Sequence, residues 1–110
     1  MKTLHLTLAY RWYDMIESKE KTEEYRELKW IGRICRFGKT ACGIQCPLNH
    51  ASCPTVPTDY THVVFHRGYS KTMMLWSIDN ITIGRGNPDW GAPDKEVVII
   101  KLKERKGDDQ

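Results

Sequence analysis

The sequence has no apolar run long enough to cross a bilayer, and it has no internal repeat. Its first residues, Met1 to His5, also lack the apolar core of a signal peptide. We therefore expect a soluble, cytoplasmic protein that does not use a membrane as a partner. A chain of 110 residues has room for one compact core, so residues 1–110 are expected to form a single domain.

The sequence also has no large excess of either charge sign. Seventeen basic residues stand against fourteen acidic ones, which leaves a net charge of +3. This balance permits nucleic-acid binding but does not require it. Residues 101–110 mix both signs around Gly107, so we expect residues 103–110 to be a disordered tail and not a binding arm.

Hydrophobic patterns predict the first elements. Apolar and polar residues alternate from Leu4 to Leu8, which is typical of a half-buried strand. An apolar stripe at helical spacing predicts a helix from Tyr10 to about Lys19, with Lys19 at a position where a capping glycine is usual. Residues 21–28 are expected to form a second strand, and residues 30–35 either a short helical turn or irregular structure.

The second half of the chain is rich in strand patterns. Residues 38–59, rich in Gly, Pro and Cys, read as a long inserted loop. Strands are then predicted over residues 61–66, over 73–83 as one long strand or a bent pair, and over 97–102. The last is apolar on both faces and should lie inside a sheet. These elements predict an α+β domain, and a small barrel would remove exposed strand edges.

Charged side chains and a hydroxyl are concentrated between Ser18 and Arg26. In a strand, alternate residues share a face, so Thr22, Glu24 and Arg26 would lie together. Lys21, Glu23 and Tyr25 would lie on the opposite face. An acid and a base on one face can pair and jointly hold a polar ligand, and the alternative is a solvated edge strand.

This segment, Lys19-Glu20-Lys21-Thr22-Glu23-Glu24-Tyr25-Arg26, resembles the Gly-x-Lys-Thr-x-Glu-x-Arg motif of the ASCH domain, with Lys19 in place of the glycine. Residues 65–70 and 86–93 also look like segments of small ASCH proteins, many of them encoded by phages. The resemblance covers about residues 3–102. It implies a small PUA-like β-barrel with one or two short helices, and a cleft lined by the motif strand. Such a cleft is expected to bind RNA, a nucleotide or a modified nucleoside.

The resemblance leaves the activity open. One bacterial subgroup of the family hydrolyses acetylated cytidine, with a motif lysine followed three positions later by a nucleophilic threonine. Lys21 matches the lysine, but Glu24 stands at the nucleophile position, and no clear match for a distant catalytic glutamate is found. The alternatives to binding are therefore a small hydrolase, acting on acetylated cytidine or RNA with Lys21 as base and Glu24 holding water, and a phage-type module that captures a protein partner through residues 38–59.

Several other side chains are candidates for ligand contact. Arg26 can donate paired hydrogen bonds to a phosphate or a base edge, and Thr22 can offer a hydroxyl. In the polar turn after the third predicted strand, Arg67 and Lys71 suit phosphate contacts and Tyr69 suits stacking on a base, unless the turn is merely solvated. Ser70 in the same turn is a further candidate for ligand binding. Trp90 is either a stacking platform or a plug at one barrel end. Trp12 and Trp76 fit apolar stripes and are expected in the core.

Three of the four cysteines stand near a histidine in the predicted loop. Cys42, Cys46, His50 and Cys53 offer zinc-type ligands, although their spacing matches no common zinc finger. Disulfides are disfavoured in a cytosolic chain. We expect reduced free thiols and no cofactor, with a structural zinc as the alternative.

Overall fold

The computed structural model describes residues 2–36 and 55–106. They form one five-stranded sheet in the order β1-β3-β4-β5-β2. The strands are β1 (Thr3–Leu8), β2 (Glu23–Arg26), β3 (His62–Arg67), β4 (Met73–Arg85) and β5 (Glu96–Lys106). β1 and β3 run parallel, and the other neighbours run antiparallel. The α-helices are α1 (Tyr10–Glu17) and α2 (Ile31–Ile34), and the 3₁₀ turns are η1 (Leu28–Trp30) and η2 (Pro88–Trp90).

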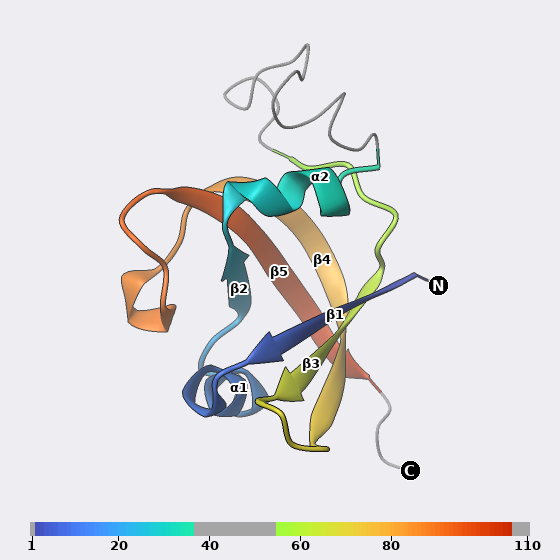
Figure 1. Ribbon diagram of the computed structural model, residues 1–110, viewed down its shortest axis with the longest axis vertical. Coiled ribbons are helices and arrows are strands. Elements are labelled where there is room, and N and C mark those ends of the chain that lie inside the picture. The colour runs from blue at the N-terminus through green and yellow to red at the C-terminus, as the bar shows by residue number, and fades with distance from the viewer. Residues whose placement is uncertain (1, 37–54, 107–110) are drawn as a thin grey trace.

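The sheet curls into part of a barrel, with α1 and α2 near its opposite ends (Figure 1). The predicted α+β class, a barrel-like sheet with two short helices, is confirmed at this level. In β1, Leu4, Leu6 and Leu8 are buried and the residues between them face outward, as the alternation predicts. β5 lies between β4 and β2, so the prediction that it is an interior strand is also confirmed.

Two boundary predictions need correction. β5 continues to Lys106, so residues 103–106 are strand and not tail, because the long strand β4 supplies partners as far as Leu75. The end of the predicted loop is also structured, since Val56 is buried and Thr55 and Thr58 form β-bridges. Of the two alternatives for residues 73–83, the single long strand is confirmed, since β4 is continuous from Met73 to Arg85 with two register shifts around Ile78.

The chain leaves α1 through a left-handed residue. Lys19 has a φ of 71°, and its N–H donates to the Ile16 carbonyl at 3.0 Å. This conformation costs an L-residue about 1–2 kcal/mol and suits glycine. The position was correctly identified as a glycine-type cap, although the sequence places lysine there.

Lys19→Gly is expected to raise the free energy of unfolding by about 0.5–1 kcal/mol, because relief of backbone strain exceeds the added entropy of the unfolded chain. Urea denaturation measures the change. Ser18→Gly is the matched control, since Ser18 has a right-handed φ of −78° and should be destabilised by glycine. Equal effects of the two changes would contradict the strain argument.

Candidate functional site

A cluster of three charged side chains forms at the start of β2, and we call it the β2 charge cluster. Lys21 Nζ lies 3.1 Å from Glu24 Oε1, and Arg26 Nη2 lies 3.1 Å from Glu24 Oε2. Lys21 is 2% exposed and Glu24 is 6% exposed, whereas the Arg26 side chain keeps 21% of its surface. Because both inner charges are largely removed from water, each compensates the other's desolvation.

The predicted distribution of this segment over two faces is wrong at its first two residues, Lys21 and Thr22, although Glu24 and Arg26 do lie together. Lys21 was expected on the face opposite Glu24, but β2 begins only at Glu23, so strand alternation does not extend back to Lys21. Thr22 was expected beside Glu24 and Arg26. It is instead exposed and borders a separate hollow of about 370 Å³ together with Lys19 and the end of β5.

The Lys21 side chain is almost completely enclosed by other residues. Its ammonium donates to the Trp90 carbonyl and lies 4.8 Å from the Trp12 ring centroid and 5.1 Å from that of Tyr25. Lys21 therefore lies in a packed junction and is not accessible as the base that the hydrolase alternative requires. Lys21 joins α1, β2 and η2, and a role as base would require these neighbours to move.

Tyr25 fixes the η2 segment against β2. Its hydroxyl donates to Glu23 Oε1 at 2.8 Å and accepts from the Asn87 N–H at 3.0 Å. Burial raises the pKa of Tyr25 above its ordinary value, so the hydroxyl stays protonated at neutral pH. Trp90 is partly buried and packs against a small cluster of Tyr25, Ala92 and Val97. Of the two roles considered for Trp90, this packing favours the plug.

Gly86 lies directly under the Tyr25 ring. A Cβ at this position would come within 2.8 Å of Ala92 and even closer to Tyr25. Gly86→Ala is therefore expected to lower the free energy of unfolding by about 1–3 kcal/mol, because the buried ring cannot move aside.

Thermal or urea unfolding measures this loss. Gly84→Ala is the matched control two residues earlier, since its nearest contact would be Ile99 Cδ1 at an ordinary 3.7 Å. Its effect should stay within about 0.5 kcal/mol. A loss from Gly86→Ala no larger than that of the control would show that the η2 segment is not fixed on Tyr25.

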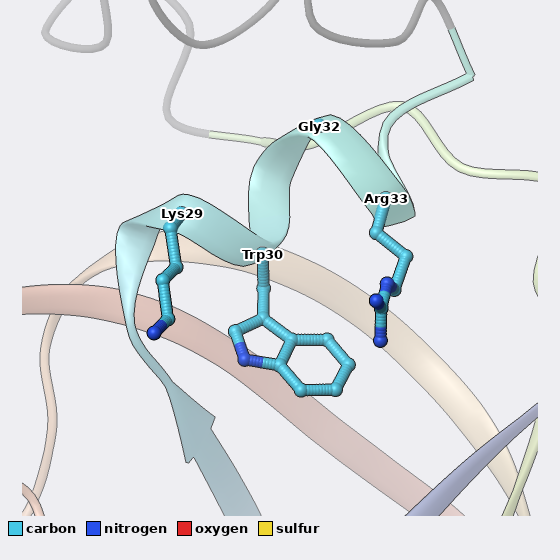
Figure 2. Close-up of a pocket in the computed structure, with 4 residues that line it drawn as sticks. All are labelled: Lys29, Trp30, Gly32 and Arg33. Carbon is cyan, nitrogen blue, oxygen red and sulfur yellow. The ribbon is translucent and has the colours of Figure 1, made fainter.

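A hollow of about 660 Å³ lies beside the outer end of the charge cluster, lined by Lys29, Trp30, Gly32 and Arg33. We call it the Trp30 hollow. The side chains of Lys29, Trp30 and Arg33 extend from η1 and α2 toward the sheet (Figure 2). The Trp30 ring centroid lies 5.4 Å from the Arg26 guanidinium and 4.8 Å from that of Arg33. Two cations therefore flank one partly buried indole.

Arg26 belongs to both the charge cluster and the surroundings of this indole. Besides its contact with Glu24, Nη2 donates to the Thr7 carbonyl at 3.2 Å. Its Nε is buried and has no hydrogen-bond partner among the described residues. Sequence reasoning selected Arg26 but left Trp30 without a role and did not single out Lys29 or Arg33. The spacing of Trp30 and Arg33 in the sequence could have indicated that they lie together, since residues three apart share a helical face.

A second hollow of about 870 Å³ lies between α1 and η2, and its lining includes Arg11, Trp12, Glu20 and Asp89. The Arg11 guanidinium lies 4.6 Å from the Trp12 ring centroid. Trp12 is partly buried, packs against the hydrophobic core and also borders this hollow, so its core assignment is confirmed only in part. Trp76 is 5% exposed, and its core assignment is confirmed.

The polar turn after β3 holds the candidates Arg67, Tyr69 and Ser70. Arg67 donates from Nε and Nη2 to the two carboxylate oxygens of Asp14 at 2.9 and 3.0 Å, and its guanidinium lies 4.2 Å from the Tyr10 ring centroid. These hydrogen bonds hold the pKa of Asp14 below its ordinary value. Ser70 Oγ donates to the Arg67 carbonyl, whereas Tyr69 is fully exposed. Arg67 and Ser70 therefore fasten the turn, and Tyr69 alone is open for stacking.

The residues Cys42, Cys46, His50 and Cys53, expected to carry free thiols with a structural zinc as the alternative, lie outside the described residues. Within residues 2–36 and 55–106, no group of three or more His, Cys, Asp and Glu side chains is placed to hold a metal ion. Cys35 is buried with a free thiol. In the same two ranges, no helix has the length and apolar character needed to span a membrane.

Comparisons of this chain with protein-family models, with curated proteins and with solved structures gave no match. The ASCH resemblance therefore remains a prediction, and the function has to be argued from the geometry of the site.

Proposed function

We propose that this protein binds single-stranded RNA or a nucleotide-like ligand, with the Trp30 hollow as the main contact surface. The observation that carries the proposal is the indole of Trp30 with the guanidinium groups of Arg26 and Arg33 within 5.4 Å of its centroid. An aromatic ring offers a surface for base stacking, and neighbouring cations attract the phosphates. Lys29 adds a third cation to the same hollow.

The charge cluster prepares Arg26 for this role. Glu24 and the Thr7 carbonyl hold Nη2, and Glu24 is itself held by the buried Lys21. An arginine fixed in this way loses little conformational entropy when a ligand binds. The buried pair of Lys21 and Glu24 thus fixes the position of Arg26 at the proposed binding surface.

Hydrolysis is the second candidate, and the observation that favours it is a buried base and acid only 3.1 Å apart. Such pairs occur in active sites. Binding is the better supported of the two, because both groups are occupied by each other and by neighbouring residues, with little surface left for a substrate. Incubation with acetylated cytidine and with RNA decides between them. We expect neither cytidine nor shortened RNA, and turnover would reverse the order.

The test of binding is a titration of fluorescein-labelled single-stranded RNA followed by anisotropy at 50 and 200 mM salt. If two or three phosphates are contacted, the affinity should fall about 7- to 18-fold over this range, since the salt slope is about −0.7 per phosphate. Free nucleotides are titrated in parallel by competition. Binding that does not respond to salt would indicate an uncharged ligand, and absence of binding to both RNA and nucleotides would contradict the proposal.

A further inference from the structure

Two histidines meet on the outer surface of the sheet, on strands that are far apart in sequence. β1 and β3 are parallel, with His5 opposite Val64 and Thr7 opposite His66, so the two histidines are diagonal neighbours. The alternate residues Val63 and Phe65 are buried, which places the histidines on the solvent side. Nδ1 of His5 lies 3.2 Å from Nε2 of His66, and the ring centroids are 5.5 Å apart.

We infer that His5 and His66 form an open two-histidine site for a divalent transition-metal ion such as Zn²⁺ or Ni²⁺. Metal–imidazole bonds of about 2.0–2.1 Å separate two bound nitrogens by about 2.9 Å at an octahedral right angle and by about 3.3 Å at a tetrahedral angle. The observed 3.2 Å lies between these values. The two rings are thus spaced for chelation with little movement of either strand.

Without metal, the same spacing makes a hydrogen bond between two neutral imidazoles, in which one ring donates and the other accepts. For chelation the donating ring takes its other tautomer, so that Nδ1 of His5 and Nε2 of His66 both offer lone pairs. No net proton is released. The protein supplies two ligands, and water or a bound molecule completes the coordination, which makes the site open and exchangeable, unlike a closed structural zinc site.

Ni²⁺ is a suitable probe because imidazole binds it well and because it is paramagnetic. The full chain, labelled with ¹⁵N and freed of metal, receives substoichiometric Ni²⁺ while amide signals are recorded by NMR. We expect broadening centred on β1 and β3, at the amides of His5, Thr7, Val64 and His66. Broadening that leaves these amides unchanged would overturn the inference.

Variants separate this site from thiol ligands elsewhere in the chain. His66→Asn and His5→Gln should each weaken Ni²⁺ binding at β1 and β3 at least tenfold. His62→Asn is the matched control, since His62 is on the same face of β3 and its Nδ1 lies 2.8 Å from Thr61 Oγ1. It should leave the affinity unchanged. Two outcomes would show that the pair is only a hydrogen bond. One is an equal loss of Ni²⁺ affinity in His62→Asn and His66→Asn. The other is an unchanged Ni²⁺ affinity in folded His66→Asn and His5→Gln. The outcome is independent of RNA binding.

Discussion

Glu24→Ala is expected to lower the free energy of unfolding by about 3–5 kcal/mol, because it removes one partner of a buried ion pair. Lys21, which is 2% exposed in the intact protein, would keep only the Trp90 carbonyl and two aromatic rings among the recorded neighbours of its ammonium. These neighbours do not replace a carboxylate. Arg26 would also lose the contact that fixes Nη2 at 3.1 Å from Glu24.

Urea denaturation followed by circular dichroism measures this loss. Glu27→Ala is the matched control three residues later, since Glu27 pairs with Lys29 and Lys95 at 3.4 and 3.9 Å through a side chain that is 60% exposed. Its loss should stay below about 1 kcal/mol. A double change to Lys21→Met and Glu24→Leu should recover part of the stability, because the cost comes from an uncompensated charge. A loss below 1 kcal/mol for Glu24→Ala alone would show that Lys21 finds water or another partner.

The hydrophobic pattern of the sequence was sufficient to predict those strands in which it reflects burial of the side chains. The alternation in β1 and the two-faced apolar run in β5 both describe side chains that have to leave water, and both strands appear where predicted. The charged end of β5 was missed because residues 103–106 carry no apolar pattern of their own. They are strand because residues of β4, including Leu75 and Trp76, pair with them.

The members of the β2 charge cluster were predicted, but their geometry was not. Lys21, Glu24 and Arg26 were selected from the sequence, and the structure brings these three together. Their arrangement depends on the left-handed turn at Lys19, which delays the start of β2 and brings Lys21 to the side of Glu24. The prediction of strand alternation from Lys21 onward is wrong because β2 begins only at Glu23.

The contact between Arg26 and Trp30 could not be derived from spacing, because the chain passes from strand to 3₁₀ turn between them. The 3₁₀ turn places the Trp30 indole beside the Arg26 guanidinium, which is also paired with the buried Glu24. In the proposed function, Arg26 therefore contributes to both stability and binding. Loss of Glu24 should weaken RNA binding as well as folding, whereas loss of Trp30 should affect binding more than stability.

Trp30→Ala is expected to weaken binding of single-stranded RNA roughly 5- to 150-fold, since stacking on one aromatic ring contributes about 1–3 kcal/mol per base. Trp30→Phe should retain most of the affinity because it keeps an aromatic face. Anisotropy titrations at fixed salt measure both, and circular dichroism confirms that each variant is folded. Arg33→Gln provides a second test of the same hollow, because it removes a cation 4.8 Å from the ring centroid without removing the ring.

Tyr69→Ala is the matched control for the loss of an aromatic ring. Tyr69 is fully exposed in the turn between β3 and β4, and it was the stacking residue expected there from the sequence. If the Trp30 hollow holds the base, Tyr69→Ala should change the affinity less than twofold. If Tyr69→Ala weakens binding and Trp30→Ala does not, the ligand lies on the β3–β4 turn and the proposed site is wrong. If both variants bind more weakly, the ligand has to be long enough to reach from α2 to that turn. A length series of RNA oligomers tests this, because only the longer oligomers would then bind Tyr69→Ala more weakly than the unchanged protein.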